Sequence, residues 1–241
     1  MPAAPDDPLA SVADLDGVGV AAAHARDAID ALLGHRAMRR EAAAVAAESA
    51  LRGARASAEL AGGDADDVDD PHLQGALRAL GEVPSLAKVW ERSPRQALAR
   101  LHVLAARDLV SDPDTLGRPR PDVDAARLDQ LMTVTGAPTR APGVVVAAIV
   151  HGELLAVRPF GVADDLVARA AERIVLVAKG VDTKAVGVPE AGHAALSRAY
   201  LPLAQAYQGG TATGVGAWVR HCAEAYARGA EDGLAIAAAR T

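Results

Sequence analysis

The near absence of aromatic side chains is the feature that most constrains how this chain can fold. Apolar residues make up 51% of its 241 residues but aromatic residues only 2%, so a core has to be built from Ala, Leu and Val. Such segments favour the α-helix, because alanine loses no side-chain entropy on helix formation. Small side chains also let helices approach one another closely. The composition therefore predicts an all-α fold, and no segment alternates convincingly enough to be a β-strand.

Charge and cysteine content exclude several classes of protein. The formal net charge of -6 argues against a general nucleic-acid binder, which would need a basic face. The single cysteine, Cys222, rules out an internal disulfide framework and leaves nothing for a cysteine-based zinc site, so no metal site is expected. The N-terminus does not resemble a signal peptide, and no uncharged apolar stretch approaches the roughly 20 residues that span a bilayer. We therefore expect a cytoplasmic protein that does not bind membranes.

Composition and loop signals divide the chain into an arm and one domain. Residues 1–16 are rich in Pro, Ala and Asp and are expected to be a mobile N-terminal arm. Residues 17–241 are expected to form a single helical domain, with N-terminal helices over 17–110 and the core over 124–241. The intervening segment 111–123 contains three prolines, which predicts a loop or a short β-hairpin at most.

Capping signals and apolar spacing predict the helices. Residues 143–157 are the most apolar segment, and their length favours a buried helix over a strand. Pro202 is expected to kink or break the helix that starts at Pro189, and residues 209–216 are expected to be a loop. The expected helices cover 18–33, 36–60, 71–80, 95–109, 125–134, 143–157, 164–178, 189–207 and 218–233.

One stretch carries the strongest functional signal. Residues 158–169 read Arg-Pro-Phe-Gly-Val-Ala-Asp-Asp-Leu-Val-Ala-Arg and contain the only phenylalanine, Phe160. This stretch resembles the signature of the Fic (Fido) family, H-P-F-x-[DE]-G-N-G-R-x-x-R, to which Pro159, Phe160 and Arg169 match. The resemblance implies a Fic-type helical domain with the signature between two central helices. It also implies that residues 111–123 stand where the family has its target-docking flap.

The family's chemical groups are missing from this stretch. Arg158 stands at the position of the catalytic histidine, and a guanidinium has no lone pair with which to accept a proton. Val162 stands at the position of the acidic metal ligand and offers no oxygen. Asp164 and Asp165 stand within the phosphate-binding Gly-Asn-Gly-Arg run, where their charges would repel phosphate. No catalytic residue and no cofactor are therefore expected.

A second part of the resemblance lies in the first half of the chain. Many Fic proteins carry an inhibitory helix with the pattern [ST]-x-x-x-E-[GN], whose glutamate competes with the nucleotide. Residues 57–62 fit this pattern at Ser57 and Gly62, but Ala61 replaces the glutamate. The resemblance implies an inhibitory-helix remnant. The alternative is that an alanine-rich helix contains a serine followed by a glycine by chance.

The charged residues of the signature have structural alternatives. Arg158 and Arg169 together would form an anion-binding site, or they would pair with Asp164, Asp165 or Glu172 as structural ion pairs. At least one of the two aspartates would serve as a helix N-cap. The alternative is that the two together form a metal or cation site. Phe160 is most simply a core anchor.

The histidines give weaker signals. His151 lies in an apolar helix and is more typical of a satisfied core histidine than of a catalytic base. His193 is expected near a helix start. His221 and Cys222 are sequence neighbours that point in different directions on a helix, so the sequence does not support a Cys-His pair.

Three functions follow from these residues. The resemblance implies a catalytically inactive Fic-like protein, with a lost adenylyltransferase site, that acts by binding or regulating an unknown protein partner. The alternative enzyme is an active nucleotidyl or phosphoryl transferase with a rebuilt site, which would use ATP and magnesium. The third function, unrelated to Fic, is an alanine-rich helical assembly protein whose apolar faces form a homo-oligomer.

Overall fold

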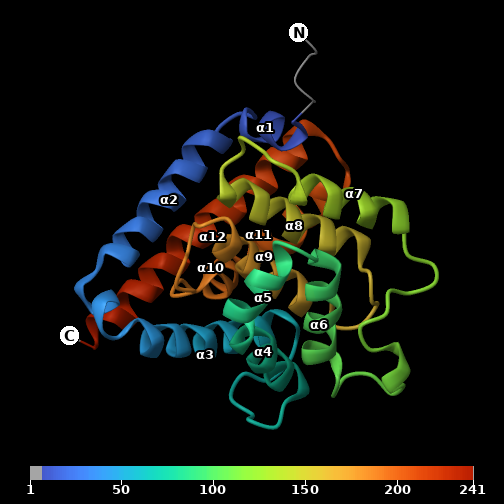
Figure 1. The fold of residues 1–241 in the computed structure, drawn as a ribbon, viewed down its shortest axis with the longest axis horizontal. Helices are drawn as coiled ribbons and strands as arrows, with labels where there is room; N and C mark the ends of the chain where they lie inside the picture. The colour runs from blue at the N-terminus through green and yellow to red at the C-terminus, as the bar shows by residue number, and fades with distance from the viewer. Residues whose placement is uncertain (1–6, 241) are drawn as a thin grey trace.

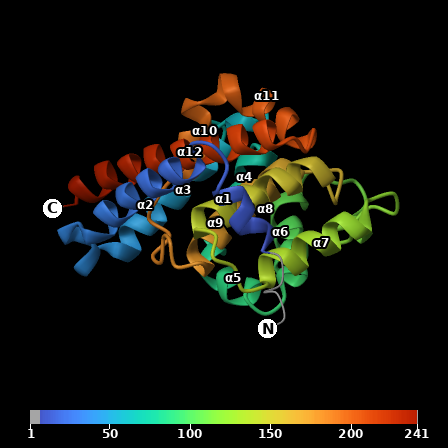
Figure 2. The ribbon, with the colours of Figure 1, turned by 90° about the horizontal axis from the view of Figure 1, so that it is seen from above.

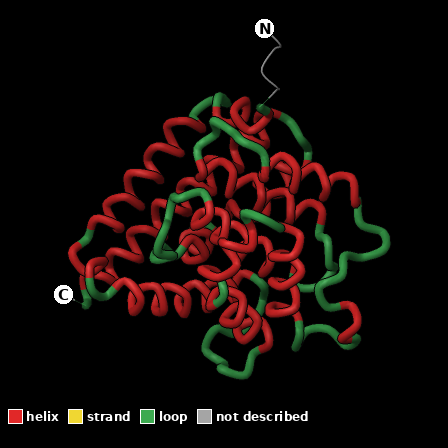
Figure 3. The backbone as a smooth tube through the Cα atoms, in the orientation of Figure 1, coloured by secondary structure: helices red, strands yellow, loops and turns green. Residues whose placement is uncertain are grey.

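A computed structural model describes residues 7–240. Within this range the chain forms twelve α-helices and two short 3-10 helices, with no β-strand, which confirms the prediction of an all-α fold (Figures 1 and 3). The elements are α1 (Pro8–Ala13), α2 (Val18–Gly34), η1 (Arg36–Arg39), α3 (Ala42–Leu60), α4 (Pro71–Gly81), α5 (Val83–Trp90), α6 (Pro94–Ala106), η2 (Pro113–Thr115), α7 (Ala125–Gly136), α8 (Gly143–Val157), α9 (Asp164–Ala178), α10 (Pro189–Ala195), α11 (Ser197–Gln208) and α12 (Ala212–Ala238).

Two neighbouring helices, α8 and α9, form the centre of the molecule. Most of their residues are buried, because helices pack on them from several sides. Helices α4, α5 and α6 pack against α9, while α11 and α12 pack against α8. The long helix α12 also contacts α2 and α10, and α2 lies alongside it in both ribbon views (Figures 1 and 2).

The apolar helix α8 has the bounds that its sequence predicts. Most of its apolar side chains are buried against other helices, as expected for a helix at the centre of a globular domain. Among the residues described, no helix combines the length and hydrophobicity that are needed to cross a membrane.

The N-terminal arm is a correction to the sequence analysis. Residues 1–6 of the expected arm lie outside the described residues, but residues 7–16 pack on the domain. Leu9 of α1 is buried. The Asp7 carboxylate accepts hydrogen bonds of 2.8 Å from the Thr139 hydroxyl and from the Arg140 backbone N–H. A buried leucine and an anchored carboxylate therefore fix a segment whose composition suggested mobility.

Two expected helix boundaries are wrong. The helix expected over 36–60 is divided, with a 3-10 turn at its start and α3 beginning at Ala42. The break expected at Pro202 falls instead at Leu196, between α10 and α11, and Pro202 lies inside α11. Because proline has no N–H, the carbonyl group of Arg198, four residues earlier, has no donor within the helix. Pro202 and Arg198 are both exposed, so water can donate a hydrogen bond to that carbonyl group instead.

The start of the last helix is also corrected. Residues 212–216 were expected in a loop because of their glycines, but they belong to α12. The Thr211 hydroxyl caps this helix by accepting a hydrogen bond of 3.1 Å from the Gly214 N–H. Gly214 is needed there because a β-carbon would overlap the Ala206 carbonyl of α11.

No hairpin forms over the described residues 111–123. The segment contains η2 and turns, and the Asp112 carboxylate accepts a hydrogen bond of 2.9 Å from the Asp114 N–H. Its prolines have no N–H with which to build a strand ladder. Of the two alternatives that the sequence left open for this segment, a loop or a short β-hairpin, the structure has the loop.

Close helix contacts at glycine give the first prediction. A β-carbon at Gly75 of α4 would overlap the backbone carbonyl of Ala105 in α6, whereas one at Gly81, in the same helix, would meet nothing. We expect Gly75→Ala to lower the free energy of unfolding by about 1–3 kcal/mol, because α4 and α6 must separate. Gly81→Ala should leave it unchanged or raise it by up to about 1 kcal/mol. Chemical denaturation of both variants checks this, and equal effects would contradict it.

Candidate functional site

The signature stretch forms the turn between α8 and α9. Arg158 and Ala163 flank it with φ angles of 48° and 55°, in the left-handed region that non-glycine residues seldom adopt. The Phe160 side chain is 8% exposed. Its ring stacks on that of His102 from α6, with ring centroids 4.1 Å apart and planes 4° from parallel. Phe160 is therefore the core anchor that the sequence analysis expected, and it fixes the turn to a neighbouring helix.

The Asp164 side chain is hydrogen-bonded to the backbone of this turn. Its two carboxylate oxygens accept hydrogen bonds from the backbone N–H groups of Phe160, at 2.8 Å, and Gly161, at 2.7 Å. Burial raises the pKa of this carboxyl group, and the two N–H donors partly offset that effect. Arg158 approaches the same carboxylate at 3.9 Å while its side chain remains 65% exposed. Asp164 therefore binds the turn rather than facing solvent.

Arg169 is buried and has a partner for each of its nitrogens. Its Nε and Nη2 donate to the hydroxyl and the carbonyl of Ser57, at 2.7 and 2.9 Å. Nη2 also lies 3.0 Å from the Asp165 carboxylate, and Nη1 donates to the Tyr200 hydroxyl at 3.3 Å. This arrangement favours the structural alternative over an anion site shared by Arg158 and Arg169, and the Arg169 partner is Asp165 rather than Glu172.

The end of α3 lies at the same place. Ser57 contacts Arg169, and Ala61 lines a recess of about 450 Å³ whose wall also includes Arg158. Gly62 follows with a φ angle of 83° and ends the helix. The recess is lined by Leu60, Ala61, Leu155, Arg158, Ala163, Asp164, Asp165, Leu201, Ala204, Gln205 and Gln208. The structure thus brings together the turn and the expected inhibitory-helix remnant.

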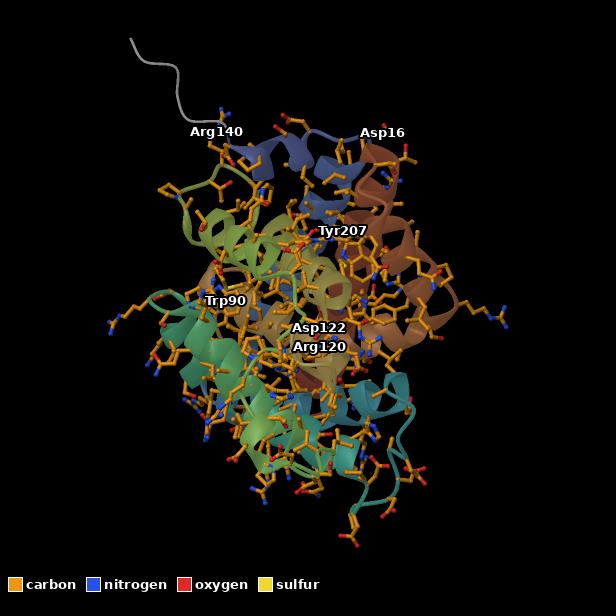
Figure 4. The ribbon with its side chains drawn as sticks, turned by 90° about the vertical axis from the view of Figure 1, so that its right-hand side faces the viewer. Asp16, Trp90, Arg120, Asp122, Arg140 and Tyr207 are labelled. Carbon is orange, nitrogen blue, oxygen red and sulfur yellow. The ribbon has the colours of Figure 1, made fainter. Side chains whose placement is uncertain are left out.

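The loop over residues 111–123 holds the turn from the other side. The Arg120 N–H donates to the Pro159 carbonyl at 2.8 Å, and its guanidinium donates to the Arg158 carbonyl at 3.1 Å. A further ion pair of 3.0 Å joins Arg120 to Asp122, and Figure 4 shows these two residues side by side. The loop is therefore attached to the turn through both the backbone N–H and the side chain of Arg120.

A second group of polar residues lies in the core. Glu172 of α9 is buried and is surrounded by donors from three other helices. Its Oε1 lies 2.8 Å from His151 Nδ1 and 2.5 Å from the Tyr226 hydroxyl, and its Oε2 lies 3.1 Å from His193 Nε2. The thiol of Cys222 is buried in the same cluster. We call Glu172, His151, His193 and Cys222 the core cluster.

Two further contacts orient the imidazoles of the core cluster. His151 Nε2 lies 2.8 Å from the Tyr200 hydroxyl, and His193 Nδ1 lies 3.2 Å from His221 Nε2. Burial opposes ionisation of Glu172, but the two facing imidazoles outweigh it and hold the pKa of this carboxyl below its ordinary value. Burial also raises the pKa of the Cys222 thiol, and the nearby Glu172 adds to the effect. Together, the contacts with Glu172, Tyr200 and His221 give every imidazole nitrogen of His151 and His193 a hydrogen-bond partner.

The turn was predictable from the sequence, but the core cluster was not predicted. His151 is the satisfied core histidine that was expected. His193, expected near a helix start, lies instead in the last turn of the short helix α10. His221 and Cys222 do not pair with each other, but Cys222 points toward His151 and His193. A signal was present in α9, where Arg169, Glu172 and Arg173 interrupt the apolar residues that follow Asp165, at spacings that share one face.

Comparisons with known proteins add no family assignment. No protein-family model matches the chain, and no curated protein matches it either. The geometry of the turn and of the core cluster therefore carries the functional interpretation.

The turn gives a prediction on stability. Phe160→Ala removes a buried ring and should lower the free energy of unfolding by about 3–5 kcal/mol. Arg158→Ala should change it by less than about 0.5 kcal/mol, because that side chain is mostly exposed. Denaturant titration of the two variants measures both changes. A small effect at Phe160 would show that the ring does not anchor the turn.

His102 gives a prediction on pH dependence. Burial lowers its pKa from 6.5 to about 4, so the unfolded chain binds a proton that the folded chain does not bind within this window. The free energy of unfolding should therefore fall as the pH is lowered from 6.5 to about 4, with a contribution of at most about 1.4 kcal/mol per pH unit from His102.

The control is His102→Asn. Asparagine does not titrate there, and its side chain keeps an acceptor for the Gly117 N–H, which donates to His102 Nδ1 at 2.9 Å. Denaturation at several pH values should give a shallower slope for the variant than for the original chain. Equal slopes would mean that His102 keeps an ordinary pKa in the folded state.

Proposed function

We propose that this chain is a Fic-like protein that has lost adenylyl transfer and acts by binding a protein partner. The observation that carries the proposal is the position of the Asp164 carboxylate. In a phosphate-binding turn, backbone N–H groups at a helix N-terminus are free to hold the anion. Here the N–H groups of Phe160 and Gly161 already donate to Asp164. A nucleotide phosphate would have to displace a carboxylate that belongs to the chain.

The other residues of the turn do not fit ATP and magnesium either. Val162 offers no oxygen to a divalent cation, and both oxygens of Asp164 accept backbone hydrogen bonds. Arg169, which the resemblance would assign to nucleotide binding, is buried against Ser57, Asp165 and Tyr200. These contacts favour the inactive protein over a transferase with a rebuilt site.

Backbone geometry supports the Fic resemblance itself. Ala163 stands at the first glycine of the signature, and its φ angle of 55° is one that glycine adopts at little cost. Ala61, which replaces the inhibitory glutamate, lines the same recess as Arg158. Both positions agree with the alignment, although their side chains differ from those of the family.

The recess in front of Arg158 is the surface that we assign to a partner. Its apolar wall includes Leu155, Ala204 and Leu201, the last of which is 64% exposed. Gln205 and Gln208 add neutral hydrogen-bonding groups to the same wall. This lining suits a partner protein that inserts an apolar side chain and offers its backbone amides to the glutamines. It suits a polyanion less well, because Asp164 and Asp165 also line the recess.

The first test is enzymatic. The purified protein should not transfer labelled AMP from ATP, with magnesium or manganese, to itself or to other proteins. ATP should bind more weakly than millimolar in calorimetry at low ionic strength, because Asp164 and Asp165 stand where phosphates would dock. Labelling above background that an Arg158 substitution abolishes would show that the rebuilt transferase is the correct function.

The second test concerns the partner. A photo-crosslinking residue at position 201 should give a discrete adduct in cells, and the same residue at position 20 serves as the control. Val20 is also exposed, at 78%, but lies on α2 outside the recess. An adduct with the mass of two chains would favour a homo-oligomer. Equal adducts at both positions would contradict a specific recess.

A further inference from the structure

We propose that the core cluster is a buried structural site for zinc(II). His151, Glu172, His193 and Cys222 come from α8, α9, α10 and α12, and their ligand atoms all lie within 4.8 Å of one another. All four side chains are buried. This assignment does not depend on the proposed function, because none of the four residues belongs to the signature turn.

The spacing of the ligand atoms suits a tetrahedral ion. Zinc is bound at about 2.0–2.3 Å by imidazole nitrogen, carboxylate oxygen and thiolate sulfur, which separates neighbouring ligand atoms by roughly 3.3–3.7 Å. Glu172 lies 2.8 Å from His151 Nδ1 and 3.1 Å from His193 Nε2. Insertion of an ion therefore requires these two contacts to widen by roughly 0.2–0.5 Å, and any pair of ligand atoms near the 4.8 Å limit to close.

The chemistry of the four ligands selects the metal. Imidazole and thiolate are ligands that zinc prefers, whereas magnesium and calcium prefer sets of oxygen ligands. One carboxylate and one thiolate together neutralise a divalent ion, which matters because an unbalanced charge in the protein interior is costly. Four protein ligands in a buried site leave no open position for a substrate, which is typical of a structural rather than a catalytic zinc.

The surrounding residues hold the ligands as in known metal sites. A metal-bound histidine usually makes a hydrogen bond through its other ring nitrogen, and this contact fixes the tautomer. His151 makes this contact to the Tyr200 hydroxyl, at 2.8 Å, and His193 makes it to His221, at 3.2 Å. The Tyr226 hydroxyl donates to Glu172 and orients the carboxylate. The hydrogen bonds that would orient the ligands of a bound ion are therefore already present.

The competing arrangement is a hydrogen-bonded core without a metal. Arg169 donates to the Tyr200 hydroxyl, which leaves the hydroxyl proton for His151 Nε2. His151 and His193 then both donate N–H groups to Glu172. This network is also complete, and the two arrangements differ in whether protons or an ion face the carboxylate.

The full-length protein can distinguish the two arrangements. It is unfolded in denaturant with a chelator, and refolded with zinc(II), with cobalt(II) or without metal. We expect one zinc ion per chain by mass spectrometry of the metal, and a higher unfolding midpoint than in the metal-free sample. Cobalt should give the absorption of a tetrahedral site together with a thiolate-to-cobalt charge-transfer band. That band identifies the site, because Cys222 is the only cysteine of the chain.

Two variants complete the experiment. Cys222→Ser should abolish the charge-transfer band, whereas His102→Asn, at a buried histidine outside the core cluster, should retain it. If Cys222→Ser does not fold, the band of the original chain still decides the question. Refolding without metal uptake and with an unchanged midpoint would overturn the proposal in favour of the hydrogen-bonded core. Stoichiometric cobalt without the band would also overturn it, because the ion would then lie elsewhere.

Discussion

The burial of three charged side chains on α9 is the constraint on which the rest of the fold depends. Arg169, Glu172 and Arg173 are each at most 1% exposed. A buried charge without a partner costs several kcal/mol, so other helices must supply partners at fixed positions. Arg169 takes them from α3 and α11, Glu172 from α8, α10 and α12, and Arg173 pairs with Glu190 of α10 at 3.1 Å. One helix therefore determines where five others pack.

Small residues make this arrangement compatible with a core that has few aromatic rings. A β-carbon at Gly192 of α10 would overlap the Ala225 carbonyl of α12, and one at Gly229 would lie 2.5 Å from the Val188 carbonyl. The backbones at these crossings are too close for any side chain. Helix α10 has only seven residues, and such a short helix is held by its contacts rather than by its own propensity. Close approach also brings His193 within reach of Glu172.

Three of the six aromatic residues gather where the polar side chains are buried. Trp218 is buried and donates from its indole N–H to the Ala148 carbonyl at 2.8 Å. Its ring lies 5.1 Å from that of His151, and Tyr200 and Tyr226 supply hydroxyls to the same region. These side chains combine apolar area with one polar atom, so they fill space around Glu172 without leaving donors unpaired.

Local sequence signals predicted most helices but few of the contacts between them. The all-α class, the bounds of α8 and the buried Phe160 turn followed from apolar spacing, proline and glycine. The core cluster did not, because its members are 21 to 54 residues apart in sequence from the partners they contact, and helical periodicity says nothing about which helices meet. The error at Pro202 has a related cause. A proline leaves one helical carbonyl group without its N–H donor, and whether the helix continues depends on whether water can reach that carbonyl group in the folded protein.

Arg169 and Tyr200 connect the turn to the core cluster, so the two sites cannot be varied independently at those residues. Arg169 bonds to Asp165 at the recess and to the Tyr200 hydroxyl, and that hydroxyl contacts His151. Loss of the Arg169 guanidinium would leave the Tyr200 hydroxyl with a different proton arrangement and would also release Ser57 from its two hydrogen bonds. Residues that touch one site only are therefore the informative ones. Asp164 reports on the turn and Cys222 on the core cluster, because neither contributes a hydrogen bond to the Arg169–Tyr200 link.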